Sequence, residues 1–241
     1  MKIISTITIS LLAANLLSAA ETNTTDQVKT AITKLKEQLN YSWTTKLEMP
    51  GMPFTPEPQH GKVSKDGIAI VTQDFNGNNT QVAFKDGKIA VFADDQWQAV
   101  TTNQDSGDFG NFPVMIARWL AGSGTAAKEA ETLLGNVKEL KAGEEGLWSS
   151  DLNDKGVAGL LAFGPSRGGG GPAVKNGKGS AKFWVKDGAL VKFESHATGM
   201  APFGPDQEER DMDVTRTVEI QDVGKTTVEI SEAAKKKLAD K

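Results

Sequence analysis

The sequence predicts an α+β fold in which one long antiparallel sheet curls and helices lie against one of its faces. The main observation is the tripeptide Lys-Asp-Gly, which occurs at 65–67, 85–87 and 186–188, each time before an apolar segment. Asp-Gly favours a two-residue type I′ hairpin turn, because glycine adopts positive φ freely and aspartate tolerates it. With Asn76-Gly77, the first two copies place turns ten residues apart, which is typical of short antiparallel strands.

The second observation is that the expected strands carry apolar residues on both faces. In the segment 68–75, Ile68 and Ile70 share one face while Ala69, Val71 and Phe75 share the other. Sheets with one solvent-facing side usually separate polar from apolar residues more cleanly. We therefore expect something to cover each side over part of the sheet.

The N-terminal half is expected to begin with a helix that Asp26 caps, followed by a strand at 41–49. The apolar stripe of that helix consists of Val28, Ile32, Leu35 and Leu39. A proline-rich loop at 50–58 follows, because proline does not fit a central strand. The meander then continues with strands at 60–65, 68–75, 80–85, 88–94 and 97–101.

The second half mixes helices and strands and contains no linker of domain-separating length. Helices are expected at 108–121, 125–134 and 155–163, and a final one from Ser231. Strands are expected at 137–140, 147–152, 179–186, 189–197, 212–223 and 226–230, with glycine-rich loops at 164–172 and 199–204. We expect residues 21–241 to form a single domain.

The first twenty residues have the pattern of a signal peptide. Lys2 supplies the charged start, an apolar run from 3 to 17 follows, and Ser18-Ala19-Ala20 offers small residues for cleavage before Glu21. We therefore expect an exported protein, periplasmic or extracellular. The net charge of −4 argues against nucleic acid as a partner, and no segment predicts stable insertion into a membrane.

Cysteine is absent from the whole sequence. Thiol catalysis, thiolate metal sites and disulfides are therefore excluded. Attachment of lipid at a signal-peptide cleavage site also requires cysteine. We therefore expect the exported protein to be soluble and not anchored by acyl chains.

Residues for catalysis are scarce. The two histidines, His60 and His196, are far apart in sequence, so neither a metal site nor a cofactor is predicted. The segment 164–168 matches the G-x-S-x-G nucleophile pattern around Ser166, and Asp187 and His196 follow in the order of a hydrolase triad. That motif needs a strand before the serine and a helix after it, whereas a helical pattern precedes it here and four glycines follow.

Apolar surface is the remaining candidate for function. The expected helices at 108–121 and 155–163 carry more bulky apolar residues than two surface helices need. One hypothesis is ordinary core packing, and the other is a pocket for an acyl chain, which methionine and aromatic side chains suit. The candidate pocket residues are Trp43, Phe112, Met115, Ile116, Trp119, Val157, Leu160, Leu161 and Phe163.

The order of these parts resembles the bacterial LolA/LolB/LppX-like lipoprotein-carrier superfamily. The resemblance rests on the signal peptide, the N-terminal helix, the first strand with Tyr41-Ser42-Trp43, the meander with Asp-Gly turns, the mid-chain helices and the late hairpin at 182–188. It implies an open half-barrel of about 10 to 11 strands, with helices on its concave face and an apolar cavity that shields acyl chains. The loops at 50–58 and 164–172 depart from that family.

Three functions follow from the sequence. The first is an exported, non-enzymatic carrier that binds a lipid or the acyl chain of a lipoprotein. The second is a structural or interaction module of the same fold whose cavity is filled. The third is a serine hydrolase that acts through Ser166.

Overall fold

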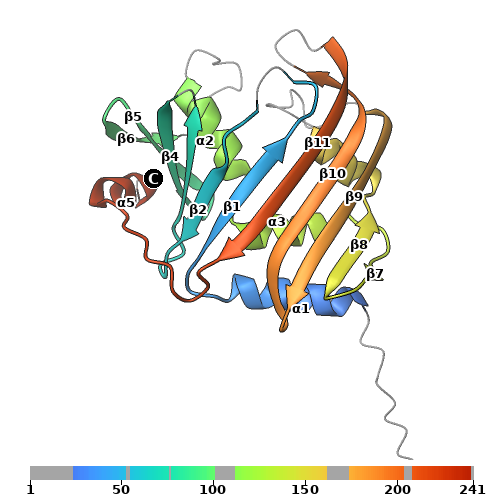
Figure 1. Cartoon of the computed structure of the whole chain (residues 1–241). Helices are drawn as coiled ribbons and strands as arrows, with labels where there is room; N and C mark the ends of the chain where they lie inside the picture. Colours follow the sequence, from blue (N-terminus) through green and yellow to red (C-terminus); the bar gives the residue numbers. More distant parts are fainter. Residues whose placement is uncertain are drawn as a thin grey trace, which may run out of the picture.

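The computed structural model describes residues 24–52, 55–75, 77–100, 112–161, 174–203 and 208–239. Eleven strands within these ranges form one antiparallel sheet in the order β6-β5-β4-β3-β2-β1-β11-β10-β9-β8-β7 (Figure 1). The first and last strands of the chain therefore lie side by side at the middle of the sheet. The signal-peptide pattern at 1–20 lies outside the described residues.

The strands of the first half are β1 Tyr41–Glu48, β2 Gln59–Val63, β3 Ala69–Phe75, β4 Asn78–Lys85, β5 Lys88–Ala93 and β6 Gln96–Val100. Those of the second half are β7 Lys141–Ala142, β8 Leu147–Asp151, β9 Lys175–Lys186, β10 Ala189–Phe203 and β11 Glu208–Gln221. The helices are α1 Thr24–Lys36, α2 Phe112–Gly122, α3 Ala126–Leu134, α4 Asp154–Leu161 and α5 Glu232–Ala239. None of these described helices is long and apolar enough to cross a membrane.

Two of the three Lys-Asp-Gly segments form the predicted two-residue turns. Asp86 and Gly87 have φ of 48° and 80°, and Asp187 and Gly188 have φ of 51° and 74°, so both central residues are left-handed as a type I′ turn requires. The prediction is wrong for Lys65-Asp66-Gly67, where only Gly67 has positive φ. That turn is longer. The amide of Ser64 donates to the carbonyl of Ile68, and within this loop the amide of Gly67 donates to the carbonyl of Ser64.

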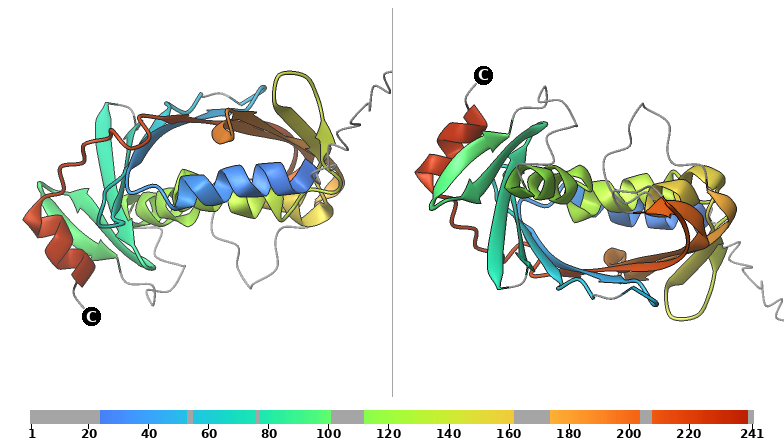
Figure 2. Two further views of the ribbon diagram at one scale, coloured as in Figure 1. Left: turned by 90° about the horizontal axis from the view of Figure 1, so that it is seen from below. Right: turned by 90° about the horizontal axis from the view of Figure 1, so that it is seen from above.

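Helices cover both faces of the sheet. The inner face carries α1 to α4, which share one apolar cluster with the inward side chains of the strands. On the opposite face, α5 packs over β4, β5 and β6, and its Ala234 and Leu238 contact Ala83 and Ala90 (Figure 2). The expectation of a cover on each side is confirmed, although the expectation that all helices lie on one face is wrong.

The predicted α+β class and the long antiparallel sheet are confirmed. The sheet is open, with β6 at one edge and β7 at the other, so the strong curl of a half-barrel goes beyond what is observed. The expected strand at 226–230 does not form. In α1 the stripe of Val28, Ile32 and Leu35 is buried as predicted, but Leu39 follows the helix end and is 65% exposed.

A glycine in β2 makes room for the largest side chain of the inner face. Trp43 in β1 lies directly opposite Gly61 in β2. A Cβ atom at Gly61 would fall on the indole ring of Trp43. Trp43 therefore lies flat across its neighbouring strand, tilted against the ring of Tyr41 with centroids 5.8 Å apart, and is buried.

We expect Gly61→Ala to destabilise the fold by about 1–3 kcal/mol, because the added methyl group must displace the indole from a packed interior. Urea denaturation measures the free energy of unfolding. The control is Gly159→Ala in α4, where a Cβ meets no atom within 4 Å and should stabilise the helix slightly. Equal stability of the Gly61→Ala variant and the native protein would contradict this packing.

Candidate functional site

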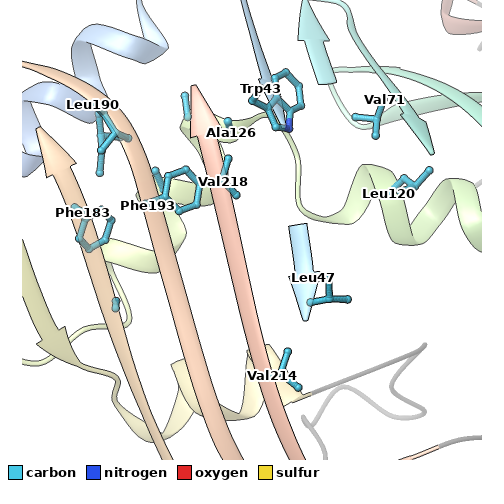
Figure 3. Close-up of a cluster of buried hydrophobic side chains, with 14 of the residues drawn as sticks. Trp43, Leu47, Val71, Leu120, Ala126, Phe183, Leu190, Phe193, Val214 and Val218 are labelled. Carbon is cyan, nitrogen blue, oxygen red and sulfur yellow. The ribbon is translucent and has the colours of Figure 1, made fainter. Parts of the chain in front are cut away.

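The candidate apolar residues come together between the inner face of the sheet and the helices. Trp43 lies on β1, and the others lie on α2 and α4; they are Met115, Ile116, Trp119, Val157, Leu160 and Leu161. All of them belong to one apolar cluster that runs the width of the sheet, part of which Figure 3 shows from Leu190 and Phe183 across to Val71 and Leu120. Phe163 and the side chain of Phe112 lie outside the described residues.

The α4 end of this cluster is tightly packed. Val157 and Leu161 are buried, and α4 lies against β9, β10 and β11. A Cβ atom on Gly177 or Gly179 would approach the side chain of Val157 to 2.9 and 3.2 Å. Because glycines of β9 are needed to admit Val157, this residue serves core packing rather than the lining of a site.

The α2 end is less completely buried. Arg118 is the one charged side chain of this helix, and Val114, Met115 and Trp119 are each only partly buried although they contact the apolar cluster. Ile116 and Leu120 are buried beneath them. A helix that is apolar nearly all round and leaves large side chains partly exposed is unusual for a simple surface element.

The floor below α2 is made by the inner face of β4, β5 and β6, on which the helix packs. Val82 and Val91 form a directly opposed pair there and are fully buried. The helix thus offers apolar side chains on its partly exposed side and contacts an apolar floor on the other. This combination suits a flexible apolar ligand better than a polar one.

A buried phenol joins β1 to the start of α3. Thr125 is the N-cap of that helix and accepts a hydrogen bond from the amide of Lys128. Within the first turn of the helix, the amide of Ala127 donates to the Tyr41 hydroxyl at 3.2 Å. Burial raises the pKa of Tyr41, and hydrogen bonds with Thr125 and Ala127 offset only part of that rise.

A buried ion pair joins α3 to the centre of the sheet. Arg216 of β11 points inward, and its guanidinium donates to both carboxylate oxygens of Glu129 and to the hydroxyl of Ser123. Only 12% of the Arg216 side chain and 16% of the Glu129 side chain are exposed. Burial opposes the charge of Arg216, but the Glu129 carboxylate outweighs that effect, so the pKa of Arg216 is raised.

Sequence reasoning missed this ion pair. The available signal was the alternation in β11, where Arg216 shares the inward face with the buried residues Val214 and Val218. An arginine at an inward position needs a carboxylate partner when it is desolvated. Nothing in the sequence identified Glu129, which lies 87 residues earlier in the chain, as that partner.

The described part of the chain does not assemble the elements of a hydrolase. Ser166 lies outside the described residues. Asp187 occupies the β9–β10 turn, whereas His196 lies well along β10, roughly 20 Å away at strand spacing. The acidic partner of His196 is instead Asp213, at 2.9 Å. Among the described residues, no group of three His, Asp or Glu side chains could hold a metal ion.

Tyr41 is the single tyrosine of the chain, so its ionisation can be followed by ultraviolet absorbance of the phenolate. We expect the native protein to titrate above the ordinary value of 10.0, because burial disfavours the phenolate. The buried, neutral Tyr41 side chain makes its full contribution to the free energy of unfolding below pH 10, and this contribution is lost as pH rises through the native pKa. A native titration that coincides with the urea-unfolded one would contradict this burial.

We expect Arg216→Met to lower the free energy of unfolding by roughly 3–5 kcal/mol, because it leaves the Glu129 carboxylate buried without a partner. The double variant Arg216→Met, Glu129→Leu should lose clearly less free energy of unfolding than the single variant, since it removes both charges. Lys36→Met is the control, because its ion pair with Glu131 is exposed and should matter little. Equal losses in the single and double variants would contradict the buried-pair account.

Comparison with known proteins identifies structures of similar fold but no family. No family model matches the sequence, and no curated protein matches it. The crystal structure of lipoprotein LppX of Mycobacterium tuberculosis aligns with 85% of this chain and 97% of its own, at 11% identity and a TM-score of 0.49. The structure of LprF from Mycobacterium bovis aligns with 88% and 97%, at 12% identity and a TM-score of 0.43.

One of these two structures, LppX, belongs to the group of proteins that the sequence resembles. LppX is described as a lipoprotein, whereas this chain contains no cysteine. Identity and TM-score are both too low for the ligand of either protein to be transferred. The chain is therefore an α+β protein structurally similar to LppX and LprF, and its function is argued from its own residues.

Proposed function

We propose that this protein is an exported carrier that binds a hydrophobic ligand, a lipid or the acyl chain of a lipoprotein, without covalent chemistry. The proposal rests on the partial exposure of large apolar side chains on α2. Its Met115 and Trp119 are only partly buried, yet they belong to the same apolar cluster as Trp43. An acyl chain lying beside α2 would bury the remaining apolar surface.

The chemistry of α2 supports an apolar ligand of variable shape. Methionine adapts to irregular surfaces because its side chain is unbranched and polarizable, and tryptophan contributes a large contact area. Burial of apolar surface contributes about 25 cal/mol per Å², so one covered tryptophan face gives a useful share of the affinity. Under this proposal the sheet and helices enclose an apolar cavity in the manner of a half-barrel, open at the α2 end.

The location of the site differs from the sequence-based expectation in one respect. We place the ligand at α2 and not at α4, because Val157 already fills the space above the glycines of β9 and Leu161 is fully buried. Export of the protein remains part of the proposal and rests on the signal-peptide pattern at 1–20. Absence of an acyl anchor rests on the absence of cysteine.

A structural or interaction module with a filled interior is the second candidate. The tight contact between Val157 and the glycines Gly177 and Gly179 favours it, because that half of the interior admits no further atoms. The two candidate functions predict different ligand binding at α2. A carrier takes up a fatty acyl probe there, and a filled module does not.

We expect the protein to bind cis-parinaric acid, and Trp119→Ala to weaken that binding about tenfold, since about 1.4 kcal/mol of apolar contact would be lost. Fluorescence titration measures the affinity. The matched control is Leu160→Ala on α4, a residue that is also partly buried but lies away from the proposed site. Urea denaturation of both variants shows that each is folded under the conditions of the titration.

Absence of binding in the native protein, together with absence of co-purified lipid in native mass spectrometry, would favour the filled module. An equal loss of affinity in Trp119→Ala and Leu160→Ala would show that the site is not confined to α2.

A further inference from the structure

A row of polar side chains crosses the half of the inner face that β1 to β4 form. Thr45 of β1 lies opposite Gln59 of β2, and Gln73 of β3 lies opposite Thr80 of β4. The pairing of His60 with Thr72 places Gln59 opposite Gln73 one step further along the ladder. Residues directly opposite one another share a face of the sheet. These four side chains, Thr45, Gln59, Gln73 and Thr80, therefore form a continuous line, called the polar row below.

The polar row is buried. Thr45 is 1% exposed, Gln73 2% and Gln59 6%, so its centre is closed off from bulk water. Trp43 and Val71 lie in the row on one side of it, and Leu47 lies in the row on the other side, where the next residue along is Arg216, paired with Glu129. Buried polar side chains in an apolar setting are normally hydrogen-bonded, because an unmet hydrogen bond costs free energy.

Two oxygens of the row have no partner in the described structure. They are the hydroxyl oxygen of Thr45 and the amide oxygen Oε1 of Gln73. The orientation of the Gln73 amide is fixed, because its Nε2 donates to the carbonyl of Glu57 at 2.8 Å. Its Oε1 is therefore a hydrogen-bond acceptor without a donor, and the Thr45 hydroxyl can both donate and accept.

The position of the polar row suits the polar headgroup of an amphiphile. It runs from β1 to β4 and ends beside the strands on which α2 packs. On the other side of β1 the same line continues with apolar residues only, from Val218 to Phe193 and Phe183. An acyl chain lying beside α2 would thus bring its attached polar group onto the row.

We propose that the polar row binds the hydroxyl groups of the ligand's headgroup, so that the ligand is an uncharged, hydroxyl-bearing amphiphile such as an acylglycerol. This inference deepens the proposed function and rests on it. Thr45 on β1 and Gln73 on β3 lie two strand spacings apart, about 10 Å, which favours a headgroup with more than one hydroxyl. None of the four side chains of the row is charged, so no counter-charge for an anionic headgroup lies within it.

The test compares two probes with the same acyl chain, 1-monooleoylglycerol and methyl oleate, by displacement of cis-parinaric acid from the native protein. Methyl oleate has no hydrogen-bond donor, so the glycerol ester should bind at least about tenfold more tightly. Thr45→Val and Gln73→Met should bring the two affinities close together while leaving that of methyl oleate nearly unchanged.

The matched control is Thr44→Val, which makes the same substitution on the same strand but on the opposite face, where Thr44 pairs with His60. It should keep the native preference for the glycerol ester. Stability gives a second readout: Thr45→Val removes an unpartnered buried hydroxyl and should not lower the urea midpoint of the ligand-free protein.

The outcomes separate this inference from the proposed function. Equal affinity for both probes, or a preference that Thr45→Val and Gln73→Met leave intact, overturns the role of the polar row but not the carrier. A crystal structure with 1-monooleoylglycerol in which the row contacts only ordered water overturns it as well. Failure of cis-parinaric acid to bind at all overturns the carrier, and the inference with it.

Discussion

The pairing of β1 with β11 is the constraint on which the rest of the structure depends. It joins the N-terminal meander to the strands of the second half and turns two separate sheets into one. Its register places Thr45 beside Val218 and Leu47 beside Arg216, so it decides which side chains meet on the inner face. Contacts between residues this far apart in sequence close a very long loop, and they are expected to form late in folding.

That pairing also divides the inner face into two chemically different halves. On the β11 side the line of Val218, Phe193 and Phe183 is wholly apolar, and α4 is packed tightly over neighbouring glycines. On the β1 side the same line becomes the polar row, and α2 leaves apolar surface partly exposed. The unpartnered oxygens of Thr45 and Gln73 lie on the same half as the partly exposed side of α2, whereas the unpartnered Nε1 of Trp148 lies on the other half. We connect the first two with a ligand because they lie in one row close to α2.

Local features of the sequence predicted the strands well, because two-residue turns and alternation are local properties. The turns at Asp86-Gly87 and Asp187-Gly188 formed as expected, and the strand expected at 41–49 is observed as β1. Contacts that depend on strand order could not be predicted: the pairing of Arg216 with Glu129 requires the position of α3 above β11. The polar row likewise exists only through the register of four strands, since its members are scattered from 45 to 80.

The polar bonds that hold α3 against the sheet limit where a ligand can fit. Polar bonds tie α3 to the sheet, through Tyr41 at its first turn and Arg216 at Glu129, in addition to its buried alanines. The helix α2 contributes the buried Ile116 and Leu120 to the apolar cluster and packs on β4 and β5. A hydrocarbon chain can replace apolar contacts at little cost, but it cannot replace hydrogen bonds or a buried ion pair. Under the proposed function the acyl chain lies beside α2, α3 remains a fixed wall, and the polar row is within reach of the headgroup.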